Sequence, residues 1–386
     1  MAPDNFTETS SESWLSRITS SIKGIFFGFI LIIGAFYLLF WNEGRAVKTA
    51  TSLDEGKKAV VHVASDKVDP ANEGKLVHLS GSVTTDDVLT DPEFKVSINA
   101  IKLNRQVLMY QWKESSNNTT TNNLGGGTTT TKTYSYSQTW SERLIDSSSF
   151  KHPQDHQNPH SMPYQSRNFA AKNVKMNAFT LSGSLIDKMS KYETYDVSIE
   201  NLNQLGINNI QGYDSGYYIG SSLSNPQIGD IKVLFKVIKP FASISLIAKQ
   251  IDSTFEPYYT ANGRQIELLT NDYVDADSMF ENAKTQNSIL TWVLRAVGWL
   301  LMFFGFSALF APLTVLADFI PFLGTLVGLG TGTVAFLLTM VCSFCTIAIA
   351  WLVYRPLLSL ILIVAVAAIV VIIMLIKQPH NKVPVQ

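Results

Sequence analysis

Apolar residues gather at the two ends of the chain, and the middle is polar. Charge-free apolar runs cover residues 25–41 near the start and residues 296–317, 331–353 and 357–376 near the end. Each is close to the roughly 20 residues that a helix needs to cross about 30 Å of hydrocarbon. We therefore expect a membrane protein with four transmembrane helices, one N-terminal and three C-terminal.

Short polar or helix-breaking segments separate the C-terminal spans. Asp318 and Pro321 end the second span, and the glycine-rich residues 324–332 that follow are expected to form a turn before the third span. Arg355 and Pro356 separate the third span from the fourth, so these two are expected to form a tight helical hairpin.

The first span has alternative interpretations. A cleaved signal peptide is disfavoured, because the run is long for one and no small-x-small cleavage site follows it. Ahead of it, Leu15, Ile18, Ile22 and Ile25 recur at helical spacing, which fits either an amphipathic helix in the headgroup region or an extension of the span.

Four spans place the tails, residues 1–24 and 377–386, on one side of the membrane and residues 42–290 on the other. The tails carry four basic residues, and the short loop between the third and fourth spans has only Arg355; the four are Arg17, Lys23, Lys377 and Lys382. Since basic residues in short segments stay on the inner side, we expect cytosolic tails and a lumenal or periplasmic domain.

In the polar middle the dominant period is two. Leu108, Tyr110 and Trp112 share one face of a predicted strand, and a second aromatic run contains Tyr134, Tyr136 and Trp140. These predict a long β-hairpin with an aromatic face and a disordered Asn/Thr/Gly-rich tip at residues 115–131.

Two further alternating runs, 231–237 and 244–248, flank Pro240 and predict a second hairpin. Leu-Ser-Gly-Ser occurs at 79–82 and again at 181–184, which fits either a duplicated β-unit or chance. Helical patterning returns at 274–287. The fold class is therefore a β-rich α+β extramembrane domain between spans one and two.

Composition narrows the function. Thirty basic and 31 acidic residues leave a net charge of −1, which excludes the basic footprint of a generic nucleic-acid binder. Both cysteines, Cys342 and Cys345, lie in the apolar C-terminal part, so no disulfide framework holds the polar middle together. At about 250 residues, that middle is long enough to bury its own core.

No common phosphate-binding, nucleophile-elbow or zincin motif occurs in the chain, and we predict no catalytic residue, cofactor or metal. His152, His156 and His160 have a spacing that would align them on a helix for a metal ion, but Pro153 and Pro159 favour a polar surface loop. Cys342 and Cys345 form a CxxC inside an apolar helix, where packing is favoured over redox chemistry.

The charged residues nearest the bilayer are candidate functional positions. Asp318 and Arg355 both fall at span ends, where solvation or snorkelling is the simpler interpretation. The polar segment 42–50 that leaves span one fits a headgroup contact or a helical continuation. Asn117 and Asn118 fit the glycosylation pattern on the translocated side, which matters only in a eukaryotic lumen.

Seven short segments, in order from span one to span four, are similar to those of a known protein family. The chain resembles the LUMA family, also called transmembrane protein 43, in WNEGRAVKTATSLDEG (41–56), NEGKLVHLSG (72–81), MYQW (109–112), LSGSLIDK (181–188), NPQIGDIKV (225–233), WVLRAVGW (292–299) and YRPL (354–357). The Asn/Thr/Gly-rich insertion and the N-terminal tail depart from the family, and the histidine loop matches it only around His156, Asn158 and Pro159.

The resemblance implies an integral protein of the endoplasmic reticulum and inner nuclear membrane that self-associates and organises membrane protein complexes, with emerin and lamins as partners. Similar proteins occur in bacteria, where an inner-membrane protein with a periplasmic domain is implied instead.

Two classes of function remain. The favoured one is a non-enzymatic scaffold that pairs with itself, with other membrane proteins and with lipids but not with nucleic acid, for which Tyr110 and Trp112 are candidate interaction positions. The alternative is lipid handling or small-solute transport along a path that includes Asp318, Arg355 and the glycine cluster. An intramembrane enzyme ranks third, because Asp318 has no predicted partner acid or base.

Overall fold

The computed structural model describes residues 5–197, 202–357, 359–361 and 364. Contacts divide the chain into two units. The first is β-rich and contains residues 1–10, 52–120 and 130–282, and the second contains residues 11–51, 121–129 and 283–386.

Three long helices dominate the second unit. They are α1 (Trp14–Ala59), α3 (Ala276–Ala317) and α4 (Pro321–Tyr354), and each is long and apolar enough to cross a membrane. They account for the predicted first, second and third spans, one N-terminal and two C-terminal. The predicted fourth span, 357–376, lies almost entirely outside the described residues.

The helices are longer than the apolar runs. The one helix α1 includes both the segment before span one and the polar segment 42–50, so the two helical-extension interpretations hold at its ends. In the same way α3 begins at Ala276, which confirms helix in the predicted segment 274–287.

The predicted turn at 324–332 is wrong, because these glycine-rich residues form the start of helix α4. Helix α4 begins at Pro321, where proline at the first helical position gives up no needed hydrogen bond, and it continues through the glycines. Gly324 packs against Asp318, and a Cβ built on it would lie 1.7 Å from Asp318 Oδ1. Glycine at 324 therefore lets the start of α4 pack closely against the connection that follows α3.

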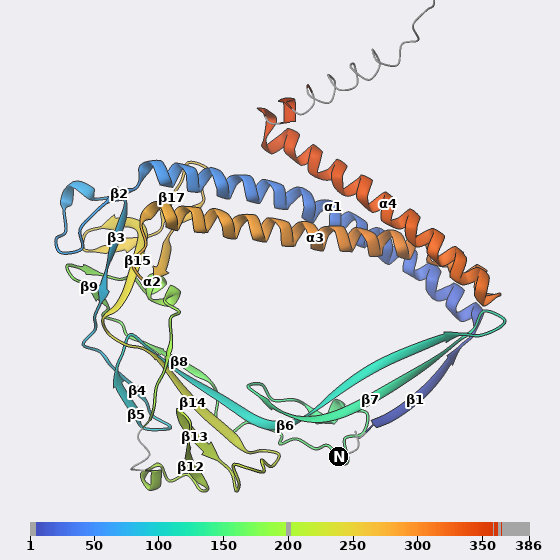
Figure 1. Ribbon diagram of the computed structural model, residues 1–386, viewed down its shortest axis with the longest axis horizontal. Coiled ribbons are helices and arrows are strands. Elements are labelled where there is room, and N and C mark those ends of the chain that lie inside the picture. Colours follow the sequence, from blue (N-terminus) through green and yellow to red (C-terminus); the bar gives the residue numbers. More distant parts are fainter. Residues whose placement is uncertain (1–4, 198–201, 358, 362–363, 365–386) are drawn as a thin grey trace, which may run out of the picture. The chain divides into compact units, whose positions relative to one another are not determined.

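Helices α1 and α3 lie side by side and cross at a pair of glycines (Figure 1). A Cβ on Gly28 would lie 2.7 Å from the carbonyl oxygen of Gly305, and a Cβ on Gly305 would lie 2.9 Å from that of Gly28. Small residues allow this approach, which the apolar solvent of a bilayer does not itself drive.

Most of the β structure lies in two sheets. The larger has the order β1-β7-β6-β14-β13-β12, with β8 beside β6 and β11 beside β14. Its strands are β1 (Asn5–Glu12), β6 (Lys102–Asn122), β7 (Thr128–Ser141), β8 (Arg167–Ala170), β11 (Glu193–Thr194), β12 (Ile210–Tyr213), β13 (Gly216–Ile219) and β14 (Ile231–Ile238).

The second sheet has the order β16-β15-β3-β2, with β19 beside β15. Its strands are β2 (Val61–His62), β3 (Leu76–Val83), β15 (Ala242–Ile251), β16 (Thr254–Glu256) and β19 (Leu268–Asn271). Three two-stranded pieces complete the strands: β4 (Val88–Asp91) with β5 (Val96–Asn99), β9 (Lys175–Met176) with β10 (Phe179–Thr180), and β17 (Tyr258–Tyr259) with β18 (Gln265–Ile266).

Short helical pieces connect these strands, namely α2 (Gly183–Lys188) and 3₁₀ turns at Pro70–Asn72, Ser147–Ser149 and Leu202–Leu205. One apolar core joins the inner faces of both sheets, with Leu79, Val107, Phe235 and Leu246 among its fully buried members. This confirms a β-rich domain between the N-terminal and C-terminal apolar helices.

The first predicted hairpin is confirmed, because β6 and β7 are neighbours in the larger sheet. The predicted disordered tip is wrong: β6 continues to Asn122 and β7 resumes at Thr128, so most of the Asn/Thr/Gly-rich segment is strand. Threonine favours strands, and the two strands supply each other's backbone hydrogen bonds.

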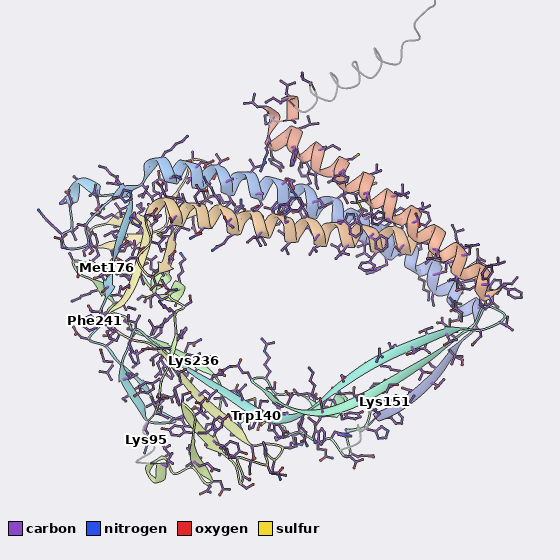
Figure 2. The ribbon with its side chains drawn as sticks, viewed as in Figure 1. Lys95, Trp140, Lys151, Met176, Lys236 and Phe241 are labelled. Atoms are coloured by element: carbon purple, nitrogen blue, oxygen red, sulfur yellow. The ribbon has the colours of Figure 1, made fainter. Side chains whose placement is uncertain are left out.

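The second predicted hairpin is wrong, although both of its strands exist. Strand β14 pairs Ile231 with Met109 of β6, whereas β15 pairs Leu246 with Leu79 of β3, in the other sheet. The connection carries Phe241, labelled in Figure 2, at a left-handed φ of 65°. Alternation identifies a strand but not its partner.

The Leu-Ser-Gly-Ser echo is not a duplicated β-unit. The first copy lies within β3, and the second spans a loop and the start of α2. The same four residue types are compatible with a buried strand or a helix start, because the flanking residues decide between them.

Candidate functional site

The end of the first apolar run carries a buried carboxylate that joins three helices. Glu43 of α1 is 0% exposed and accepts hydrogen bonds from Arg295 of α3, from Nε to Oε1 at 2.6 Å and from Nη2 to Oε2 at 2.9 Å. The indole N–H of Trp351 on α4 donates to the same Oε2 at 2.8 Å. We call Glu43, Arg295 and Trp351 the Glu43 cluster.

A second polar layer continues the contact between α1 and α3. Asn42 donates to the carbonyl oxygen of Thr291 at 3.0 Å. Arg45 donates to Oδ1 of Asn287 and to Oγ1 of Thr291, both at 2.9 Å, and Asn287 donates back to the carbonyl of Ala46. Each bond joins the two helices, so the layer sets their register.

Aromatic packing attaches the end of α4 to α1 at the same level. The ring of Tyr354 lies 5.4 Å from that of Phe40 and covers Gly44, where a Cβ would lie 2.5 Å from its Cζ. Arg355, one of the predicted positions, caps α4 and lies 5.9 Å over the ring of Trp351. Three of the family-like segments, WNEGR, WVLRAVGW and YRPL, thus meet here.

The other predicted charge, Asp318, is not solvated as its span-end position suggested. It is buried and pairs with Arg17 of α1 at 2.5 Å, and Asn122 donates to its Oδ1 at 3.1 Å. A buried carboxylate requires such partners, and the arginine comes from a segment 301 residues away along the chain. We call Arg17, Asp318 and Asn122 the Asp318 cluster.

The tip of the β6–β7 hairpin is part of this contact. Arg17 Nη1 donates to the carbonyl of Gly126 at 2.5 Å, and the N–H of Gly125 donates to the carbonyl of Phe319 at 3.1 Å. Trp14 lies against Gly126, where a Cβ would meet its ring at 2.3 Å. The predicted topology assigns residues 42–290 and Asp318 to opposite sides of the membrane, whereas in the structure Asn122 contacts Asp318 and Gly125 contacts Phe319.

The structure does not bring Asp318 and Arg355 together. They flank α4, whose 34 residues at 1.5 Å each span about 50 Å. The glycines 324–332 lie within the first turns of the same helix. A single path through all three features therefore has to follow the whole length of α4.

Tyr110 and Trp112 lie on a face that their own unit half covers. The buried face of β6 is the opposite one, with Val107, Met109 and Gln111. Tyr110 packs 5.0 Å from Trp140, which Figure 2 labels, and donates to Gln138.

The histidine loop surrounds Trp112. His156 is buried, lies edge-on to Trp112 at 4.7 Å and stacks on Tyr136 at 3.8 Å. Asn158 accepts from the N–H of Trp112 and donates to its carbonyl, as a neighbouring strand would. In the described part of the chain no three His, Cys, Asp or Glu side chains are grouped to hold a metal ion.

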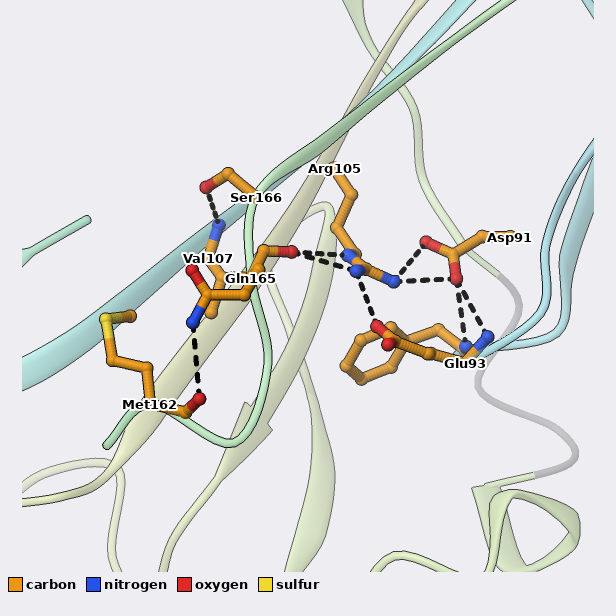
Figure 3. A network of polar contacts seen from close by, with 8 residues as sticks. Asp91, Glu93, Arg105, Val107, Met162, Gln165 and Ser166 are labelled. Atoms are coloured by element: carbon orange, nitrogen blue, oxygen red, sulfur yellow. Dashed lines mark hydrogen bonds and ion pairs between the residues drawn. The ribbon is translucent and has the colours of Figure 1, made fainter. Parts of the chain in front are cut away.

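A buried arginine stabilises the β-rich unit (Figure 3). Arg105 of β6 donates from Nη1 to both carboxylate oxygens of Asp91, at 2.7 and 2.8 Å, and pairs with Glu93 at 2.5 Å. Its Nε and Nη2 donate to the carbonyl of Gln165. Because every hydrogen-bonding edge of the guanidinium is used, this network is structural.

The cysteines are free thiols on α4, with Cys342 packed against the α1–α3 contact and Cys345 exposed.

The sequence analysis did not identify Glu43, Arg295 and Trp351 as a group. One signal in the sequence could have found it. Glu43 follows the apolar run 25–41 and Arg295 precedes the run 296–317, so the two side chains lie at the same depth if both runs are spans.

Comparison with known proteins gives a consistent result. The family model described as Transmembrane protein 43 matches residues 109–356. The proteins named Transmembrane protein 43 from Mus musculus and Homo sapiens are 34% identical over 361 and 366 residues, which is 91% and 92% of this chain and 89% and 90% of theirs. The Drosophila melanogaster protein named Transmembrane protein 43 homolog is 29% identical over 354 residues, 88% of this chain and 91% of its own. No solved structure shows a significant match.

Proposed function

Because this chain belongs to the transmembrane protein 43 family and is an integral membrane protein, we propose that it is a non-enzymatic scaffold that self-associates and organises protein complexes in its membrane. Three apolar helices anchor the chain, and the β-rich unit presents surfaces to partners.

The observation that carries the proposal is the use of the charged residues at the ends of the apolar runs. Glu43 is neutralised by Arg295, and Asp318 by Arg17, so both carboxylates serve to hold helices together. A transport path needs groups that change partners, whereas these are committed within the chain. The predicted path is further disfavoured because Asp318 and Arg355 flank α4 at its two ends.

The helices leave room for membrane partners. Only 11–22% of the most apolar stretch of each helix is buried within the chain. In a bilayer such surface contacts lipid or other helices, and small residues and shape decide which. The proposal assigns part of it to a second copy and to other membrane proteins.

The proposed location is the one that the family resemblance implies, the endoplasmic reticulum and inner nuclear membrane, with emerin-like and lamin-associated partners. If the source is bacterial, the proposal becomes an inner-membrane scaffold with a periplasmic domain.

Mass determination of tagged full-length protein in native lipid nanodiscs tests this function. A discrete oligomer with stoichiometric membrane-protein partners is the expected result. A lone protomer without such partners would contradict it.

A paired variant tests whether the aromatic face of β6 makes the contact. Tyr110→Ala with Trp112→Ala should abolish assembly while circular dichroism stays unchanged, and Tyr259→Ala, which removes an exposed aromatic ring from another strand, serves as the control. If the double variant loses its β signal, the face is core and the assembly surface lies on the helices.

A further inference from the structure

Strand β6 has a length of backbone edge that no other strand covers. On one side it pairs with β7, and on the other β14 pairs with it from Lys102 to Met109 only. Asn158 then takes the place of a strand for one residue, since it bonds both the N–H and the carbonyl of Trp112. Beyond Trp112, β6 continues past the end of β14 with a strand on one side only (Figure 1).

Alternation along β6 identifies the residues that face the uncovered side. In an antiparallel ladder, successive residues direct their N–H and C=O groups to opposite sides. Tyr110 donates its N–H to the carbonyl of Asp230, on the side of β14. In steps of two beyond Trp112, the residues that face the same side are Glu114, Ser116, Asn118 and Thr120. No described residue bonds their N–H groups, and we call residues 114–120 the open edge of β6.

Side-chain contacts with β7 agree with this assignment. Tyr110 packs against Trp140 across the hairpin, and the hydroxyls of Thr120 and Thr130 lie 3.0 Å apart. Close side chains of this kind are typical of antiparallel pairs that do not exchange backbone hydrogen bonds. The backbone groups of Tyr110 and Thr120 therefore point away from β7.

The open edge lacks the features that protect exposed strands. Folded proteins blunt such edges with lysine, proline, a bulge or a covering segment, because unpaired backbone groups bind other strands. Residues 115–120 are Ser-Ser-Asn-Asn-Thr-Thr, and all of them are exposed. This segment contains no charge, no proline and no left-handed φ. A strand of another chain can therefore add to it.

The sequence of the open edge favours a second copy of the same edge. Antiparallel pairing of two copies, centred on Asn117, sets Glu114 opposite Thr120 and Lys113 opposite Thr121. Like charges are then not opposed, and the serine, asparagine and threonine side chains between them can form cross-strand hydrogen bonds. Copies anchored in one membrane by the same helices also carry this edge at the same height.

We propose that two copies of this chain join by antiparallel pairing of the open edges of β6, which makes their β6–β7 hairpins one continuous sheet. The pairing rests on the proposed function, whose self-association it places at one backbone edge. It also extends the face that carries Tyr110 and Trp112, because alternate residues of a strand lie on one face.

A cross-link tests the pairing and its register. The chain has two cysteines, so Cys342→Ser with Cys345→Ser gives a background without thiols. In that background Asn117→Cys should give a disulfide-linked dimer on mild oxidation of the membranes, because residue 117 faces its own copy in a pair with close side chains. Ser137→Cys is the control, since it is exposed on β7, whose two edges pair with β6 and β1. Equal dimer yields from the two variants would overturn the proposal.

A proline variant tests whether the backbone edge itself makes the contact. Asn118→Pro removes an outward N–H and places a ring in the way of an incoming strand, but it takes no hydrogen bond from β7, so the hairpin is retained. The dimer-to-protomer ratio in native lipid nanodiscs should fall about tenfold or more, with unchanged circular dichroism. Asn118→Ser keeps the N–H and should leave the ratio unchanged.

The outcomes distinguish this contact from the proposed function as a whole. A chain found only as a lone protomer overturns both. An oligomer that Asn118→Pro leaves intact overturns only the pairing at the open edge, and self-association then belongs to another surface. Loss of a different protein from the complex in Asn118→Pro, while the copies remain associated, would also overturn the pairing, because the edge would then bind another chain's strand.

Discussion

The Glu43 cluster and the Asp318 cluster use the same chemistry in different settings. Each pairs a buried carboxylate with an arginine from another part of the chain, and the two clusters lie on either side of the apolar run 25–41 of α1. The Glu43 cluster is built from helix residues alone. The Asp318 cluster also includes Asn122 and the carbonyl of Gly126, from the tip of a β-hairpin.

The Glu43 cluster depends only on how three helices pack, whereas the Asp318 cluster also depends on a long β-hairpin that reaches the helices. Glu43, Arg295 and Trp351 need only the correct packing of three helices. The cluster of Arg17 and Asp318 also involves the hairpin tip, which belongs to the Asn/Thr/Gly-rich segment. We therefore expect the first cluster to dominate stability.

Glu43→Ala should have the largest effect. It leaves the Arg295 guanidinium without its carboxylate in an apolar layer, and breaking a buried pair in this way costs about 3–5 kcal/mol. Thermal unfolding of the purified protein in detergent measures the loss. The double variant Glu43→Leu with Arg295→Leu should cost less than Glu43→Ala; a greater cost would mean that the pair contributes net attraction beyond mutual neutralisation.

Gly28→Leu tests the helix crossing between the two clusters. The new side chain would meet the backbone of Gly305 and force α1 from α3, at a cost of about 1–3 kcal/mol. Gly34→Leu on the same helix is the matched control, because nothing lies within 4 Å of the site of its Cβ. Equal melting temperatures for the two variants would show that α1 and α3 do not pack closely at Gly28.

Asp318→Asn should have a smaller effect than Glu43→Ala, roughly 1–3 kcal/mol. Arg17 keeps its bond to the carbonyl of Gly126, so the guanidinium is not left without a partner. The same thermal unfolding measures the change, and a loss equal to that of Glu43→Ala would remove the distinction between the clusters.

Cross-linking sharpens this comparison. In a Cys342→Ser, Cys345→Ser background, Asn122→Cys and Asp318→Cys should form a disulfide, since their side chains are in hydrogen-bond contact. Asn117→Cys, on the exposed strand, is the control partner. A folded protein without this disulfide would place the tip away from Asp318 and agree with the predicted topology for residues 42–290.

The smallest expected effect is a pH dependence within the β-rich unit. His78 is buried beside His62, with 3.2 Å between the two Nδ1 atoms, bonds to the carbonyl of Val274 and lies near Asp275. Burial, with the charge of His62 adding to it, lowers the pKa of His78 below its ordinary value. The unfolded chain then binds the proton more readily, so stability is retained above about pH 6.5 and falls as pH decreases through that value.

Thermal unfolding near neutral and near acidic pH measures this dependence. His78→Gln should reduce it, and His160→Gln, at an exposed histidine, should not. An unchanged pH dependence in His78→Gln would assign it to other groups.

Much of the fold was readable from local patterns. The apolar runs at 25–41 and 296–317 lie within α1 and α3, and the alternation at 107–112 and 231–237 lies within β6 and β14. Helix and strand periods depend on near neighbours, so the chain reports them directly. The predicted turn at 324–332 is wrong because glycine, which destabilises helices in water, is common in apolar membrane helices; here Gly324 and Gly328 let α4 pack against Asp318 and Thr314.

The partners of strands and of charged side chains could not be predicted from the sequence, because they are distant from one another in the chain. The partner of β14 is β6 and not β15, and Glu43 meets Arg295 across 252 positions. Of the predicted positions, Asp318 is buried against Arg17, a residue that the sequence analysis used only to predict the topology.

The sequence by itself determined where this protein has apolar helices, where it has strands and to which family it belongs. The tertiary structure alone decided which charges meet and which glycines let helices touch. The physical reason is that hydrophobic length and period are properties of one segment, whereas neutralising a buried charge requires atoms that only folding brings together.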